Sequence, residues 1–308
     1  MTPVLQAEKL SKWYGHILGI SDITLDIGKG IKGLLGPNGA GKSTFLKVIS
    51  GQLKPNIGTI RIFGETVFGN HRLFTRVGFC PEQDSFYAEM TGGQFIRFLA
   101  TLHGFPPAQA GERSERALDQ VGLLENRDKL IRAYSFGMRQ RLRIAAAILH
   151  DPEVLLLDEP LRGIDPLWRI RIIKMIKDFG KEGRTIIVSS HILPEIEAMT
   201  DDIILIHQGK VFAEGDIHYI RGLIDAHPHQ ISIRCTEARR LAQILIRFEF
   251  VRSADFDHET GAVLLTTDNR DSFYGSLLNA IIENNLEVEE IASPDDNLQA
   301  VFDYLIGR

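Results

Sequence analysis

The nine residues GPNGAGKST at 36–44 constrain the fold more than any other stretch of the chain. They match the pattern G-x-x-x-x-G-K-[ST], in which glycines let the backbone wrap around a phosphate chain and point several N–H groups at it. An apolar stretch, IKGLLG, precedes them at 31–36, and STFLKVIS at 43–50 has the character of a helix start. The sequence therefore predicts a short buried strand, a phosphate-binding loop and a helix whose N-terminus faces the same anion.

Every residue of this loop is a candidate ligand of a nucleotide. The expected phosphate contacts come from Gly36, Pro37, Asn38, Gly39, Ala40, Gly41, Lys42, Ser43 and Thr44. Lys42 supplies a positive charge for the β- and γ-phosphates and is a candidate catalytic residue, and the Ser43 hydroxyl is a candidate magnesium ligand. The loop is therefore expected to bind a phosphate chain together with Mg²⁺. For the glycine run alone, a plain turn is the alternative interpretation.

A phosphate-binding loop of this kind needs a second, acidic strand end, and VLLLDEP at 154–160 supplies one. Its continuous apolar run is typical of a strand covered on both faces of a parallel sheet. We expect Asp158 to help hold Mg²⁺ and Glu159 to polarise an attacking water. Taken alone, these acidic residues could instead be a solvated strand end that caps a turn.

The remaining pattern of the first two thirds of the chain is that of a mainly parallel α/β protein. TIIVSSH at 185–191 reads as another buried strand, and residues 201–215 read as two strands joined at Gln208-Gly209. Strands that alternate with helices favour a parallel sheet. Residues 91–150 carry helical periodicity without a good strand, so a helical insertion is expected there.

After about residue 225 the pattern changes to that of a small α+β module. His227-Pro228-His229 is expected to be a linker. The following segments read as strand, helix, strand, strand, helix, strand and closing helix, at 230–235, 237–248, 250–257, 261–268, 271–285, 286–292 and 296–306. The order βαββαβ predicts a ferredoxin-like fold. We therefore predict a domain at 1–225, with a helical subdomain at about 85–150, and an accessory domain at 226–308.

Composition excludes several classes of protein. The chain has 308 residues and a net charge of −5, and it lacks a dense Lys/Arg tract, so no nucleic-acid partner is expected. Apolar runs such as IAAAIL at 144–149 are far shorter than the roughly 20 residues of a membrane-spanning helix. We expect the chain not to cross a membrane by itself, although it could lie against one. The two cysteines, Cys80 and Cys235, match no disulfide or metal spacing.

The stretch YSFGMRQRLRIAAAILHDPEVLLLDEP at 134–160 resembles the signature, helix and acidic strand of the nucleotide-binding subunit of ABC transporters. Ser135 and Gly137 match the signature serine and its second glycine, while Phe136 stands where the first glycine is usual. The form Y-S-x-G-M-x-Q-R is similar to the type-2 exporter branch. The resemblance implies that Ser135 and Gly137 bind ATP from the second subunit of a dimer.

Four more residues match family motifs in chain order. The resemblance implies that Tyr14 stacks on adenine, and that Gln83 senses the γ-phosphate and Mg²⁺ as a catalytic and metal-binding residue beside the membrane partner. It also implies that Asp165 is a nucleotide-binding residue that communicates between the two subunits of the dimer. His191 is expected to contact the γ-phosphate as a catalytic residue. Leu161 stands where the family often has Ser or Thr. Each residue alone would have a plain structural explanation, such as a buried aromatic ring or a hydrogen-bonded polar group.

The resemblance covers residues 4 to about 220 and implies a P-loop NTPase of the ABC type with a helical subdomain. It implies an ATPase that works as a head-to-tail homodimer and powers a separate integral-membrane permease of an exporter. Such a subunit is peripheral, at the cytoplasmic face of the inner (plasma) membrane. The alternatives are a soluble ABC-type ATPase that acts on ribosomes or DNA, and a module in which ATP only regulates assembly. A P-loop kinase fits the signature stretch poorly.

Overall fold

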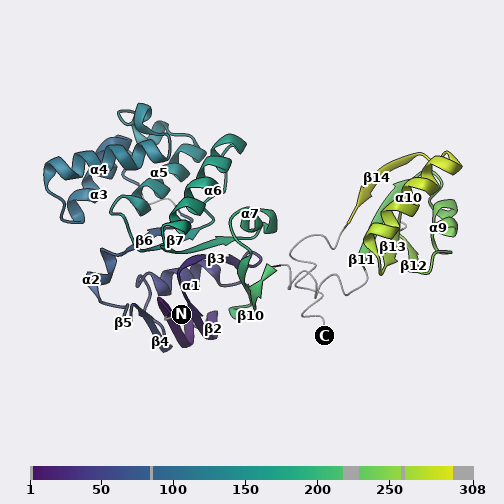
Figure 1. Ribbon diagram of the computed structural model, residues 1–308, viewed down its shortest axis with the longest axis horizontal. Helices are drawn as coiled ribbons and strands as arrows, with labels where there is room; N and C mark the ends of the chain where they lie inside the picture. The colour runs from purple at the N-terminus through teal and green to yellow at the C-terminus, as the bar shows by residue number, and fades with distance from the viewer. Residues whose placement is uncertain (1–2, 84–85, 218–228, 258–260, 294–308) are drawn as a thin grey trace. The chain divides into compact units, whose positions relative to one another are not determined.

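The computed structural model describes residues 3–83, 86–217, 229–257 and 261–293, and the chain divides into two compact units, residues 1–216 and 217–308 (Figure 1). The domain boundary predicted between residues 225 and 226 falls outside the described residues, as does the closing helix predicted at 296–306.

A six-stranded sheet forms the centre of the first unit. Its order is β10-β9-β3-β8-β7-β6, and all strands are parallel except β10, which pairs antiparallel with β9. The strands are β3 (Gly30–Leu35), β6 (Val77–Cys80), β7 (Val154–Asp158), β8 (Thr185–Ser190), β9 (Asp202–His207) and β10 (Lys210–Asp216). Every residue of β7 and β8 is buried, as their apolar runs predict. The carboxyl ends of the parallel strands meet at one edge, where open α/β sheets bind ligands.

A second, antiparallel sheet of order β2-β1-β4-β5 belongs to the same unit. It consists of β1 (Leu5–Tyr14), β2 (Ile17–Ile27), β4 (Ile57–Ile62) and β5 (Glu65–Thr66). The helix after the glycine loop, α1 (Lys42–Ile49), buries Phe45 and Leu46 in one apolar core together with residues of both sheets. This shared core fixes the position of the glycine loop relative to both sheets.

The predicted helical insertion is confirmed. It contains α3 (Gly92–Leu102), α4 (Pro107–Gln120) and α5 (Phe136–Ile148), with short 3-10 helices at Leu124–Asn126 and Ile131–Ala133. Thr91 and Gln94 form a reciprocal capping box that starts α3. The other helices of the first unit are α2 (His71–Phe74), α6 (Pro166–Lys181) and α7 (Leu193–Glu197). Within the described ranges of the chain, no helix has both the length and the apolar character needed to span a membrane.

The second unit has the predicted βαββαβ order. Within residues 229–293, its described elements are β11 (His229–Cys235), α9 (Ala238–Leu245), β12 (Val251–Phe256), β13 (Ala262–Thr267), α10 (Arg270–Asn284) and β14 (Val288–Ala292). The sheet order is β12-β13-β11-β14 with antiparallel pairing throughout. Both helices contribute to one core, in which Leu241 of α9 and Phe273 of α10 join Ile231 and Ile233, alternate residues of β11. The ferredoxin-like prediction is therefore confirmed for residues 229–292.

Candidate active site

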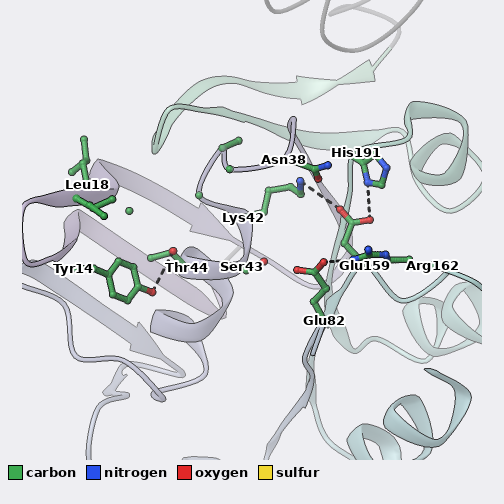
Figure 2. A pocket seen from close by; sticks show the side chains of 15 residues that line it. Tyr14, Leu18, Asn38, Lys42, Ser43, Thr44, Glu82, Glu159, Arg162 and His191 are labelled. Atoms are coloured by element: carbon green, nitrogen blue, oxygen red, sulfur yellow. Dashed lines mark hydrogen bonds and ion pairs between the residues drawn. The ribbon is translucent and has the colours of Figure 1, made fainter. Parts of the chain in front are cut away.

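A cavity of about 570 Å³ lies at the carboxyl edge of the parallel sheet (Figure 2). Its walls come from the segments that follow β3, β6, β7 and β8 of the parallel sheet, and from β1 and β2 of the antiparallel sheet. The lining residues are Tyr14, Ile17, Leu18, Gly19, Asn38, Gly39, Ala40, Gly41, Lys42, Ser43, Thr44, Glu82, Glu159, Arg162 and His191. The cavity thus combines most of the predicted loop with Tyr14, Glu159 and His191.

Close packing requires glycine at two of the three glycine positions of the loop, Gly36 and Gly41. A Cβ atom on Gly36 would lie 2.3 Å from the carbonyl oxygen of Ile206, and one on Gly41 would lie 2.6 Å from that of Gly19. Gly41 also has φ +106°, a backbone conformation that other residues adopt only with strain. It precedes α1, whose first turn has no side-chain cap. The amide groups of that turn are therefore suited to an anion in the cavity.

The Lys42 ammonium is buried at the centre of the loop. Its Nζ donates hydrogen bonds to the carbonyl oxygens of Gly36 at 2.7 Å and Pro37 at 3.1 Å, and lies 3.4 Å from Oε1 of Glu159. The predicted phosphate-binding cation and the predicted general base therefore contact each other directly (Figure 2). A phosphate that enters the loop would compete with Glu159 for this cation.

Glu159 is held in an uncommon backbone conformation, with φ +49°. Its amide donates to Oγ of Ser189 at 3.0 Å, and its carbonyl oxygen accepts a bond from Nε2 of Gln140 at 3.3 Å. Positive φ at a residue other than glycine persists only where surrounding contacts enforce it. The buried carboxylate also lies 3.0 Å from Nδ1 of His191. The ends of β7 and β8 thus bring together Glu159 and His191, two of the four residues that the sequence analysis expected to be catalytic.

Asp158 ends β7 and is fully buried. Its Oδ1 accepts a hydrogen bond from Oγ of Ser189 at 2.6 Å, whereas its Oδ2 is buried without a hydrogen-bond partner among the described residues. A buried carboxylate oxygen without a partner is costly unless a cation or water satisfies it. Carboxylate and hydroxyl oxygens are the ligands that Mg²⁺ takes, and Ser43 lines the adjacent cavity. These residues fit the expected metal.

The segment after β6 places Glu82, rather than Gln83, on the cavity. Gln83 is exposed and is not among the lining residues. The carboxylate of Glu82 forms an ion pair with Arg162, which also lines the cavity and which the sequence analysis did not single out. The stretch CPEQD offers two adjacent polar candidates, and only the structure shows which of them faces the cavity. The roles assigned to Gln83 stay a prediction.

The signature residues lie at the start of α5. Ser135 caps the helix by accepting a hydrogen bond from the amide of Met138 at 3.2 Å. A Cβ atom on Gly137 would lie 2.8 Å from the carbonyl oxygen of Gly163, so the two segments touch. Phe136, a residue that is 45% exposed, packs its ring against the backbone of Gly163. Neither Ser135 nor Gly137 lines the cavity of its own chain.

Two further predicted residues lie at the ends of elements. Asp165 caps α6 by accepting a hydrogen bond from the amide of Trp168 at 3.1 Å, and it does not line the cavity. Tyr14 ends β1 at the cavity wall, 44% exposed, with its hydroxyl 3.4 Å from Oγ1 of Thr44. An aromatic ring at the wall of a polar cavity is suited to stacking on a base.

Comparison with known proteins decides the family. The family profile described as "ABC transporter" matches residues 20–162. The bacitracin transport ATP-binding protein BcrA of Enterococcus faecalis is 34% identical over 317 residues, an alignment that covers all of this chain and 97% of the relative. The chain belongs to the family of ABC transporter ATP-binding proteins. It is the ATP-binding and ATP-hydrolysing subunit of such a transporter.

Two other comparisons agree with this assignment. The daunorubicin/doxorubicin resistance ATP-binding protein DrrA of Streptomyces peucetius is 29% identical to this ABC ATPase, and the alignment covers all of the chain and 93% of the relative. A solved ATP-binding subunit of an ABC transporter superimposes with a TM-score of 0.65 at 30% identity, covering 72% of this chain and 93% of that one. The first unit thus has the fold of an ABC ATPase, and relatives also match the second unit.

Proposed function

We propose that this ABC ATPase works as a homodimer that powers an integral-membrane permease. The observation that carries the proposal is the position of Ser135 and Gly137. The resemblance assigns both residues to ATP, yet neither lines the cavity that holds the phosphate-binding loop of the same chain. A second copy, placed head to tail, would bring the N-terminus of α5 to the open phosphates, where the helix dipole stabilises negative charge.

Within each cavity the roles follow from the contacts. Lys42 would move from Glu159 to the β- and γ-phosphates, while Ser43 and Asp158 would hold Mg²⁺. The metal would neutralise charge on the phosphates when bound. Glu159 would then accept a proton from the attacking water. His191, 3.0 Å from the Glu159 carboxylate, would keep that carboxylate oriented and face the γ-phosphate.

The relatives favour export of an antibiotic-like compound. BcrA is named for bacitracin transport and DrrA for daunorubicin and doxorubicin resistance, and both match the chain over its whole length. We propose that the permease moves a compound of the kind that these names give, outward across the plasma membrane. The ATPase would be peripheral, on the cytoplasmic side.

Two experiments test the proposal. Affinity purification in mild detergent, with co-purifying proteins identified by mass, is expected to recover a stoichiometric integral-membrane protein. Recovery with ribosomal or DNA-repair proteins instead would contradict it. For the dimer, a Ser135→Cys chain mixed with an Asn38→Cys chain should form a disulfide only with ATP and in the Glu159→Gln background. A control pair with Leu102→Cys, exposed on α3, should not cross-link.

A further inference from the structure

The aromatic ring of Tyr14 has a basic neighbour that the sequence analysis did not single out. The Lys12 ammonium lies over this ring, with its Nζ 5.9 Å from the ring centroid. A cation within about 6 Å of an aromatic centroid is attracted by the negative face of the ring. Lys12 is half-buried and does not line the cavity, whereas Tyr14 does. The ammonium therefore covers the ring from outside the cavity and leaves the cavity side of the ring open.

The edge of the same ring is held by two further residues. The register between β1 and β2 shifts beside Lys12, and Gly19 lies in that irregularity. A Cβ atom on Gly19 would lie 3.0 Å from Cε2 of Tyr14 and 2.9 Å from Cγ2 of Thr44. The Tyr14 hydroxyl lies 3.4 Å from Oγ1 of Thr44 (Figure 2). Because Thr44 belongs to α1, the ring contacts the same helix whose N-terminus faces the phosphate-binding loop.

We propose that Lys12 is a positioning residue for the base of the nucleotide, because its ammonium holds the Tyr14 ring in place for stacking. The proposal rests on the stacking role predicted for Tyr14. Because Tyr14 is 44% exposed, a contact that fixes its rotamer lowers the entropy that the ring loses when a base stacks on it. Lys12 thus raises the affinity for the nucleotide through Tyr14, without contacting the nucleotide itself.

The test is a double-mutant cycle on the full chain, with ADP as the probe because it carries the base and is not hydrolysed. Titration calorimetry measures ADP affinity in the presence of Mg²⁺. Lys12→Gln removes the charge and should weaken ADP binding about two- to fivefold, the size of an exposed cation–π contact. Lys12→Arg should stay within about twofold of wild type, since a guanidinium makes the same contact. In a Tyr14→Leu background, Lys12→Gln should have no further effect.

Lys54→Gln is the matched control, because Lys54 Nζ also lies 5.9 Å from an aromatic centroid, that of Phe68, and neither residue lines the cavity. Its ADP affinity should equal that of the wild type. Unchanged affinity in Lys12→Gln, or an equal loss in the Tyr14→Leu background, would overturn the proposal. Tyr14→Leu alone should weaken ADP binding at least about fivefold, as loss of base stacking does. If it does not, the predicted stacking is wrong, whereas the roles proposed for the phosphate-binding loop and the dimer are unaffected.

Discussion

Glu159→Gln is expected to separate ATP hydrolysis from nucleotide binding. The substitution keeps the shape of the side chain and removes its charge and its ability to accept a proton. A general base contributes about 10²- to 10⁴-fold to a rate, or about 3–5 kcal/mol of activation free energy. Because the Glu159 carboxylate is buried beside Lys42 and His191, no bulk water replaces it easily. ATP hydrolysis should therefore fall at least about 100-fold.

The same substitution should leave ATP affinity unchanged or raise it. In the structure Lys42 is shared between two loop carbonyls and Glu159, 3.4 Å away. At an effective dielectric constant near 20, two charges at this distance attract by about 5 kcal/mol, and desolvation offsets most of it. Binding of phosphate must give up this attraction. Without the carboxylate that competition is gone, and Lys42 is free for the nucleotide.

The assay pairs two measurements on the purified chain: phosphate release at saturating ATP, and ATP affinity by titration calorimetry. Glu153→Gln is the control, because Glu153 lies just before the same strand, exposed and paired with Arg76. It should stay within about twofold of wild type in both measurements. Hydrolysis by Glu159→Gln at more than a tenth of the wild-type rate would refute its role as base. Loss of ATP binding would refute the competition between Glu159 and phosphate.

Three further predictions concern the loop and the fold. Lys42→Ala should weaken ATP affinity or turnover at least about tenfold in the same assays, and unchanged kinetics would contradict its phosphate contact. Gly41→Ala should lower the free energy of unfolding by about 1–3 kcal/mol in urea, since its Cβ would strike the Gly19 carbonyl; an unchanged value would contradict this packing. Burial lowers the pKa of His150 from 6.5 to about 4, so the stability it contributes is present above pH 6.5 and lost as the pH falls to about 4. Between pH 6.5 and about 4, the free energy of unfolding of His150→Phe should therefore fall by up to about 3 kcal/mol less than that of the wild type, at about 1.4 kcal/mol per pKa unit. If the two proteins lose stability in parallel as the pH falls, this role of His150 is refuted.

The sequence predicted those parts of the fold whose pattern is local. The glycine loop, the buried strand that ends at Asp158 and the βαββαβ order of the second unit each follow from short periodic segments bounded by turns. Parallel pairing then brings β7 and β8 together, so that Glu159 and His191 meet although 32 residues separate them. Their proximity could be anticipated because the carboxyl ends of parallel strands share one edge.

The antiparallel sheet at the N-terminus escaped the sequence analysis for a physical reason. Strand prediction depends on strict alternation of buried and exposed residues, and β1 does not keep it. Its pairing with β2 shifts register at several points, and Lys9 in β1 and Asp22 in β2 have positive φ. Each irregularity moves the following residues to the other face of the sheet. The sequence of these strands therefore shows no regular alternation of apolar and polar residues, although the strands are long.

The sequence could not show whether Glu82 or Gln83 faces the cavity, because a one-residue shift in a loop changes no periodic pattern. What fixes it is tertiary: Arg143 holds the Glu82 carbonyl, and Gln140 on the same helix holds the Glu159 carbonyl. Since α5 binds both backbone segments, a partner that moves its N-terminus at Ser135 would displace Glu159 and Glu82 together. The charges of the cavity are meanwhile balanced in two pairs, Lys42 with Glu159 and Glu82 with Arg162. A phosphate that binds the loop must exchange the first of these pairs, because it competes with Glu159 for the Lys42 ammonium.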